Sequence, residues 1–308
     1  MTLAAASPTV RVRAPGKLNV FFAVGAAGED GYHDVASVYQ AVSLYEDVSA
    51  SDSDDFTLAV SGDVDVESVP LDGSNLAIRA ARLLAEHTGY RGGEHLGIHK
   101  SVPVAGGMGG GSADAAGALL ACDTLWQTGL SHTELHTLAA QLGADVPFAL
   151  LGGTAVGVGR GDRLTPALAR GRFDWVLVLA DEGLSTPRVY GVLDDLRAQV
   201  EVGPAPANPT VPAPVLHALR AGDPAALARA TWNDLQSAAF HVRPELSDIV
   251  EVGRAHGALT GLVSGSGPTV ALLAPSTTAA TSLHGDLTAL GHRAIFAHGP
   301  VSGAKVIA

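Results

Sequence analysis

The chain has 308 residues, 47% hydrophobic and 16% charged, which is the composition of a globular protein long enough for two domains. Its 19 lysines and arginines face 31 aspartates and glutamates, and the formal charge of −12 argues against a general nucleic-acid-binding surface. The single cysteine, Cys122, excludes a disulfide within the chain, and no CxxC or HExxH motif predicts a metal site.

The N-terminal residues MTLAAASPTVRVRAPGK lack the apolar core of about 7–15 residues that a secretory signal needs. Apolar runs such as WVLVLA at 175–180 are too short to span a bilayer. We therefore expect a soluble cytoplasmic protein that binds neither a membrane nor a nucleic acid. Nothing in the sequence predicts its oligomeric state.

The N-terminal third is predicted to be mostly strands. Alternating and then apolar residues at 8–24 predict one or two strands, and the Asp-Gly pair in GEDGYH at 28–33 predicts a turn. Further strands are expected at 35–48 and in DFTLAVSG at 55–62. This part of the chain should therefore form an antiparallel sheet.

Helices with recognisable ends follow. The helix at 74–89 has Ser74 or Asn75 as its N-cap and Gly89 after its end. A strand at 96–104 leads into a glycine-rich loop, after which Ser112 is the expected N-cap of a helix that extends to about Gln127. The next helix begins with a capping box formed by Ser131 and Glu134 and ends at Gly143.

Beyond residue 150, strands and helices mix without strict alternation. The expected elements are a strand and turn at 152–168, a buried strand at 173–180, a helix at 185–198, a proline-rich loop at 201–214, helices near 215–240 and 244–256, and a strand, turn and strand at 260–274. This order favours an α+β fold over a doubly wound sheet.

The glycine-rich loop at 103–112 is the clearest functional signal. Missing Cβ atoms let phosphate oxygens approach the loop amides, and the N-terminus of the following helix adds partial positive charge. The loop is not a Walker A motif, because no lysine lies between Lys100 and Lys305, and Ser112 stands where the dinucleotide fingerprint needs its third glycine. A tight turn selected only for packing is the alternative.

Three segments, APGKLNVFF at 14–22, the loop at 103–112 and SGSGPTV at 264–270, resemble the three motifs of the GHMP small-molecule kinases. Three further features, KLN at 17–19, DGYH at 30–33 and LGADVP at 142–147, resemble members whose substrate is a cytidine diphosphate-linked methylerythritol. The resemblance runs from about residue 10 to residue 275. It implies a two-domain α+β fold with an N-terminal nucleotide-binding domain over 1–160 and a ferredoxin-like C-terminal domain over 161–308.

The resemblance also implies ATP and Mg²⁺ as cofactors. Many members carry a second serine after the loop, where this chain has Ala113, so Ser112 is the expected phosphate or magnesium contact. No carboxylate cluster predicts a dedicated metal site. The residues expected to bind ATP are Pro103, Val104, Ala105, Gly106, Gly107, Met108, Gly109, Gly110, Gly111 and Ser112.

Two residues are expected to be catalytic. By resemblance, Asp145 accepts the proton of the attacking substrate hydroxyl and also contacts the substrate, and Lys17 lies beside it and offsets phosphoryl charge. An aspartate between Gly143 and Pro147 can instead be an ordinary turn residue, and a lysine in a strand can guard an exposed sheet edge.

The resemblance places the rest of the substrate against Asn19, Tyr32, His33 and Tyr190. Tyr32 and His33 would hold the cytosine by stacking and hydrogen bonds, with Tyr190 as the second aromatic, and Asn19 shares the strand face of Lys17. Each has a structural alternative: a hydrogen bond within the strand, a closed hairpin or a core aromatic. The amides of the turn at 264–270 are expected to face the substrate's phosphates or the centre of the active site, and a plain hairpin turn is the alternative. Asn233 and Asp234 receive no role.

The implied reaction is ATP-dependent phosphorylation of the 2-hydroxyl of the cytidylated methylerythritol in non-mevalonate isoprenoid biosynthesis. One alternative is another kinase of the family, acting on homoserine, mevalonate or a sugar, for which Tyr32 and His33 would have no base to bind. The other is a non-catalytic regulator that binds ATP and transfers no phosphate.

Overall fold

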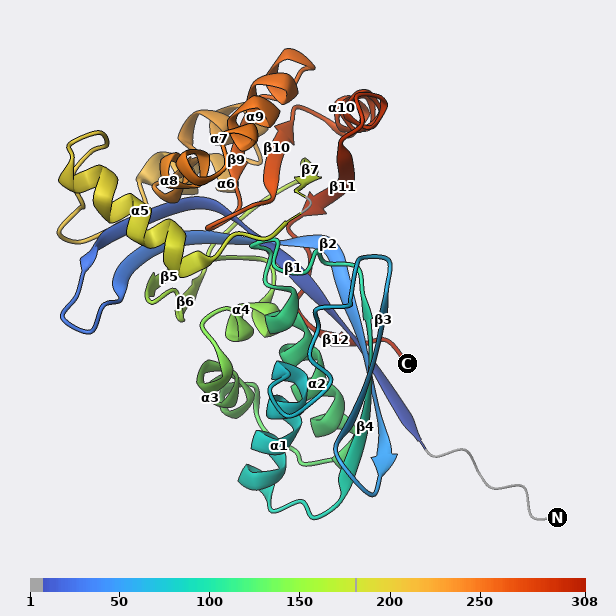
Figure 1. The fold of residues 1–308 in the computed structure, drawn as a ribbon. Coiled ribbons are helices and arrows are strands. Elements are labelled where there is room, and N and C mark those ends of the chain that lie inside the picture. The colour runs from blue at the N-terminus through green and yellow to red at the C-terminus, as the bar shows by residue number, and fades with distance from the viewer. Residues whose placement is uncertain (1–7, 181) are drawn as a thin grey trace.

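The computed structural model describes residues 8–180 and 182–308, which form two antiparallel-rich sheets with helices packed on them (Figure 1). The larger sheet has the order β12-β1-β2-β4-β3, with β5, β6 and β8 paired at its side, and the smaller has the order β11-β7-β10-β9. This arrangement of mixed helices and strands confirms the α+β prediction.

The longest elements are β1 (Thr9–Ala27) and β2 (His33–Ser53), which form one hairpin that extends across the whole molecule (Figure 1). Residues 9–24 therefore belong to one strand. The pairing shifts register between Pro15 and Gly16 and again between Asn19 and Phe21. Irregularities of this kind bend and twist a strand, so β1 and β2 contribute to both halves of the molecule.

Helices cover one face of the larger sheet: α1 (Leu76–Thr88), α2 (Gly110–Trp126), α3 (His132–Leu142) and α4 (Val146–Leu151). The first half of α2 is nearly all small residues, and a Cβ added at Gly117 would lie 2.6 Å from Cγ2 of Val48 in β2. Small side chains thus let α2 pack directly against the sheet. The expected N-cap Asn75 and the Ser131–Glu134 capping box are both confirmed.

Two predicted boundaries beside the glycine loop are wrong. The strand β4 (Gly93–Lys100) ends at Lys100 and does not extend to residue 104. The helix α2 begins at Gly110 with Gly109 as N-cap, so Ser112 is its third residue and caps nothing. The reason is that Gly109 adopts a left-handed conformation with φ of 72°, which turns the chain into the helix before the serine is reached.

The smaller sheet consists of β7 (Phe173–Leu179), β9 (Thr260–Val263), β10 (Val270–Ala274) and β11 (Arg293–Gly299). Its helices are α5 (Thr186–Ala198), α8 (Leu235–Val242), α9 (Glu245–Ala255) and α10 (Thr277–Ala289). Two further helices, α6 (Ala213–Ala221) and α7 (Pro224–Ala230), precede α8 and pack against the core that this sheet shares with β1.

The helical segment expected near 215–240 contains α6, α7 and α8, with breaks between them. Gly222 ends α6 in a left-handed conformation, Asp223 caps α7, and Pro224 begins it, so the backbone cannot continue as one helix. After α7 the short strand β8 (Trp232–Asn233) pairs with β1.

Strands β3 (Thr57–Gly62), β5 (Thr154–Gly159), β6 (Arg163–Pro166) and β12 (Lys305–Val306) complete the larger sheet. Because β6 pairs with β5, and β12 returns to β1, the chain beyond residue 160 still contributes to that sheet. The domain boundary at 160 stays a prediction.

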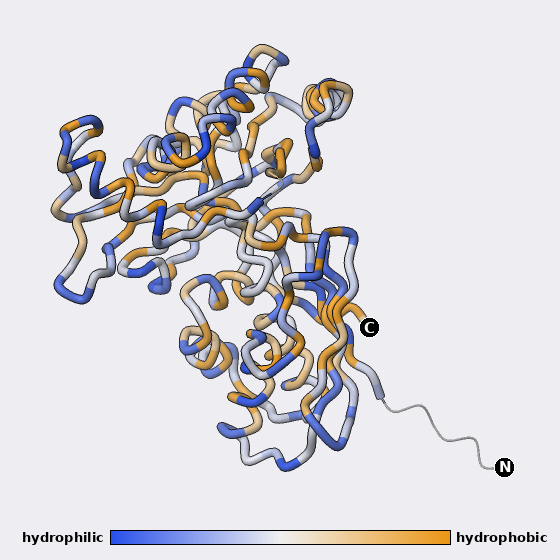
Figure 2. Tube along the Cα trace, viewed as in Figure 1, coloured by the Kyte–Doolittle hydropathy of each residue, from blue (hydrophilic) through white to orange (hydrophobic). Residues whose placement is uncertain are grey.

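Figure 2 shows that the tip of the β1–β2 hairpin is hydrophilic. No helix in residues 8–180 or 182–308 has the length and apolarity needed to cross a membrane.

Candidate active site

The glycine loop passes between β1 and the turn after β9, and two of its glycines make that passage possible. Gly107 and Gly109 have φ of 74° and 72°, a region that favours glycine. A Cβ at Gly107 would overlap the carbonyl oxygen of Ser264, and one at Gly109 would lie 3.2 Å from Cγ of Lys17. Side chains at these two positions would force the loop away from both neighbours.

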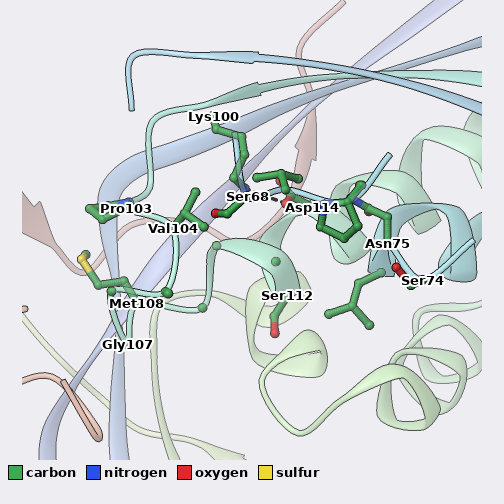
Figure 3. A pocket seen from close by; sticks show the side chains of 18 residues that line it. Ser68, Ser74, Asn75, Lys100, Pro103, Val104, Gly107, Met108, Ser112 and Asp114 are labelled. Atoms are coloured by element: carbon green, nitrogen blue, oxygen red, sulfur yellow. Dashed lines mark hydrogen bonds and ion pairs between the residues drawn. The ribbon is translucent and has the colours of Figure 1, made fainter. Parts of the chain in front are cut away.

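A cavity of about 390 Å³ lies along this loop, and all ten residues predicted to bind ATP line it (Figure 3). The amides of Gly110, Gly111 and Ser112 begin α2, where backbone N–H groups have no partner within the helix. The first helical bond is donated by Ala113 to Gly109, at 2.9 Å. The cavity therefore offers free amides and the positive end of a helix to an anion.

A buried ionic cluster, which the sequence did not predict, lines the same cavity at Lys100. Its Nζ atom donates to Oδ2 of Asp114 at 2.6 Å (Figure 3). It also donates to Oε1 of Glu46 at 2.9 Å, and all three side chains are buried. Burial and the charge of Asp114 raise the pKa of Glu46 to about 8. Burial likewise raises the pKa of Asp114. Two carboxyl groups thus share one ammonium, and a proton on one of them is favoured near neutral pH.

We expect the Gly107→Ala variant to bind ATP at least ~10-fold more weakly and to melt at a lower temperature, because its methyl group overlaps the Ser264 carbonyl. Gly129→Ala is the matched control: Gly129 also has a positive φ of 72°, but nothing lies within 4 Å of its added Cβ. Titration with ATP and thermal unfolding of both variants distinguish two effects. Backbone strain from the positive φ affects both variants, whereas overlap of the added methyl group with the Ser264 carbonyl affects only Gly107→Ala. Equal ATP affinity in the two variants would contradict the role of the loop.

The structure brings Lys17 and Asp145 together beside the loop. The Nζ atom of Lys17 lies 3.5 Å from Oδ2 of Asp145 and donates to Oδ1 of Asn19 at 2.7 Å. Asn19 in turn donates to Ser37 at 2.7 Å, which fixes its amide. Lys17 is only 8% exposed, so it does not guard an open sheet edge. Asp145 precedes α4, but its side chain caps nothing, so its carboxylate stays available for other contacts.

A second cavity of about 220 Å³ contains this pair. Gly107 and Gly109 line both cavities, so the glycine loop leads directly to Lys17 and Asp145. Tyr39 forms part of the wall, and burial, together with the negative charge of Asp145, raises its pKa well above the usual range. The phenol therefore stays neutral at physiological pH. The remaining lining residues are Asn19, Phe22, Arg160, Thr186, Tyr190, Leu235, Gly265 and Ser266.

The turn at 264–270 closes the second cavity, and Asn233 holds it in place. The side-chain amide of Asn233 donates to the carbonyl oxygens of Val263 at 2.8 Å and Gly265 at 2.7 Å. Ser264 donates to the carbonyl of Gly107 at 3.1 Å, which ties the turn to the glycine loop. Asn233 thus has the positioning role that the sequence left open.

Asp234 is also structural. It accepts a hydrogen bond from the backbone of Val24 at 2.8 Å and pairs with Arg197 of α5 at 3.3 Å. These contacts join β1 to α5 behind the cavity.

The three predicted base-binding residues are only partly brought together. The rings of His33 and Tyr190 lie 5.0 Å apart, and Nε2 of His33 lies 3.0 Å from Oδ1 of Asp194 on α5. Tyr190 lines the second cavity, whereas Tyr32 and His33 do not. Tyr32 is 59% exposed at the hairpin tip, where it contacts Arg160. Asp194 and Arg160 were not predicted, because no sequence motif links them to a hairpin more than a hundred residues away.

Comparison with protein families gives two matches. The model described as "GHMP kinases N terminal domain" matches residues 75–153, which include the glycine loop and Asp145. The model described as "GHMP kinases C terminal" matches residues 215–292, which include the turn at 264–270.

Individual relatives match over nearly the whole chain. A protein of Clavibacter michiganensis subsp. michiganensis named 4-diphosphocytidyl-2-C-methyl-D-erythritol kinase is 56% identical, and the match covers 100% of this chain and 99% of that protein. A solved structure of 4-(cytidine 5'-diphospho)-2C-methyl-D-erythritol kinase is 33% identical with a TM-score of 0.75, covering 94% of this chain and 98% of that one. The homoserine kinase of Cytophaga hutchinsonii has a TM-score of 0.73 over 100% of both chains but only 17% identity, so it shows the fold alone.

Proposed function

Because this chain belongs to the GHMP kinase family, we propose that it transfers the γ-phosphate of ATP to the 2-hydroxyl of 4-diphosphocytidyl-2-C-methyl-D-erythritol. The observation that carries this proposal is the Lys17–Asp145 pair, 3.5 Å apart, at the end of a glycine loop in a chain 56% identical to a kinase of that name. The reaction would supply a step of non-mevalonate isoprenoid biosynthesis.

In this proposal Asp145 is the catalytic base. Its carboxylate would accept the proton of the substrate hydroxyl as the oxygen attacks the γ-phosphate. Lys17, held by its hydrogen bond to Asn19, would place its ammonium against the transferring phosphoryl group. The loop at 103–112 would hold the remaining phosphates by its amides, with the nucleotide in the 390 Å³ cavity.

Magnesium fits this site as a partner of ATP. The described residues contain no cluster of three or more His, Cys, Asp or Glu side chains suited to a metal, so phosphate oxygens and water would supply most ligands. Ser112, which lines the first cavity, and Asp145, which lines the second, would each offer a protein oxygen to the ion. The ion would neutralise phosphate charge during transfer.

We propose that the cytosine binds beside the β1–β2 hairpin, against Tyr32, His33 and Tyr190. The His33 ring already uses one nitrogen toward Asp194, which leaves its other nitrogen and its main chain for the base. Asn19 would contact the substrate near the hydroxyl that is phosphorylated, since it lies next to Lys17.

A coupled assay of ADP release tests the activity directly. We expect rapid release with the cytidylated substrate and only background release with homoserine, mevalonate or no acceptor. Rapid turnover of one of those other alcohols would assign the chain to a different member of the family. ATP binding without turnover of any alcohol would instead support a non-catalytic regulator.

Competition by CDP tests the base site. We expect CDP to inhibit the wild-type protein, and Tyr32→Ala to weaken that inhibition about 10-fold, because stacking on an aromatic ring contributes about 1–3 kcal/mol per base. Tyr90→Ala is the control, since Tyr90 stacks on Trp126 at 4.0 Å and lines neither cavity. Equal inhibition of wild type and Tyr32→Ala would remove Tyr32 from the base site.

The domain limits and the cytoplasmic location stay predictions.

A further inference from the structure

Arg160 lies in the turn between β5 and β6, and this turn packs against the wall of the second cavity. The turn is closed by a hydrogen bond from the Gly161 amide to the Val158 carbonyl, at 3.2 Å. Gly161 has a φ of 94°, and a Cβ there would overlap the hydroxyl of Tyr39, which lines the cavity. Only a glycine lets the turn approach this closely, so the backbone on either side of Arg160 is held in place.

The Arg160 side chain connects two parts of the proposed substrate site. It lines the cavity that contains Lys17 and Asp145. Its guanidinium carbon lies 3.9 Å from the centre of the Tyr32 ring, and Nη2 donates to Oδ2 of Asp30 at 2.7 Å. Arg160 therefore lies between the proposed base site and the catalytic pair.

The positive charge of Arg160 matters because the second cavity has few cationic groups. Among the described residues that line the cavity, only Lys17 and Arg160 are cationic. Lys17 is already bonded to Asn19 and paired with Asp145. Because the whole chain carries a formal charge of −12, an anionic ligand needs a local positive group. Arg160 is the cation left to supply it.

We infer that Arg160 binds the diphosphate of the cytidylated substrate and thereby selects it over alcohols without a diphosphate. This inference rests on the proposed function. In that substrate the diphosphate joins the nucleoside to the methylerythritol, so it must lie between Tyr32 and Asp145, where the guanidinium is. A planar guanidinium binds phosphate oxygens in pairs.

The present partner of Arg160 can be displaced. The Asp30 and Arg160 side chains are 58% and 55% exposed, and an ion pair between exposed groups is weak. A diphosphate carries more charge than one carboxylate and offers oxygens in the bidentate geometry that a guanidinium prefers. Contact with Tyr32 can persist through this exchange, because it involves the face of the guanidinium and not its N–H edge.

Two ligands that differ only in their phosphates provide the test: CDP and cytidine, measured by titration calorimetry. We expect Arg160→Met to weaken CDP binding about 10- to 100-fold, the range for loss of a charge-assisted contact, and to leave cytidine binding within about threefold. Arg160→Lys keeps the charge but lacks the planar guanidinium, so its affinity for CDP should lie between those of wild type and Arg160→Met. Arg163→Met is the control, because Arg163 lies on β6 of the same hairpin but does not line the cavity.

The outcomes distinguish this inference from the proposed function. If wild type binds CDP and Arg160→Met binds it equally well, the role of Arg160 is overturned and the kinase proposal stands. An equal loss of CDP and cytidine would also overturn it, since that would assign Arg160 to the base alone. If wild type binds neither ligand, both proposals fail. In steady state, the KM for the cytidylated substrate should rise in Arg160→Met while the KM for ATP does not.

Discussion

Replacing Asp145 with asparagine should lower kcat by about 100-fold or more. The substitution keeps the size of the side chain but removes the carboxylate that we propose as the acceptor of the substrate hydroxyl's proton, and general-base catalysis contributes about 10²- to 10⁴-fold. The fold should be unaffected, because the Asp145 side chain makes no capping hydrogen bond to α4. The loss should appear in kcat more than in the KM for ATP, whose phosphates we propose to lie against the glycine loop.

Steady-state kinetics and thermal unfolding of Asp145→Asn measure both parts of this prediction. Asp248→Asn is the matched control, since Asp248 is an exposed residue of α9 that lines neither cavity. Turnover close to that of wild type in Asp145→Asn would remove this carboxylate from the mechanism.

Replacing Lys17 with methionine should lower kcat by about 10²- to 10³-fold, as loss of a preorganised electrostatic contact to a transition state does. Methionine keeps an unbranched apolar stem in a buried position, so the change is mainly one of charge. The chain has only three lysines, and the exposed Lys305 of β12 provides the control substitution Lys305→Met.

The double variant Lys17→Met/Asp145→Asn tests whether the two groups act together. Their charged atoms are 3.5 Å apart, so we expect the double variant to lose far less than the product of the two single losses. Strictly multiplicative losses would show that Lys17 and Asp145 act at separate steps.

The local features of this protein could be predicted from its sequence. The N-cap Asn75 and the capping box of Ser131 and Glu134 are confirmed, because each involves groups only two or three residues apart. The resemblance to the GHMP kinases was also visible in short motifs, each of which is contiguous. The expected N-cap Ser112 was wrong because the left-handed Gly109 begins α2 before the serine is reached. The helical segment expected near 215–240 is divided at Gly222 and Pro224.

The assembled site was decided by the tertiary structure. Lys17 and Asp145 were placed together only by resemblance, since nothing between them in the chain fixes their distance. The Lys100 cluster was not predicted at all, because Glu46 lies 54 residues from Lys100 and becomes its partner only when β2 pairs with β4. Arg160 meets Tyr32 by the same kind of long-range packing. Sequence determines interactions within a few residues, where the backbone itself sets the geometry. Contacts between distant charges exist only after the sheets pack and water is excluded, and those contacts are where we place the chemistry.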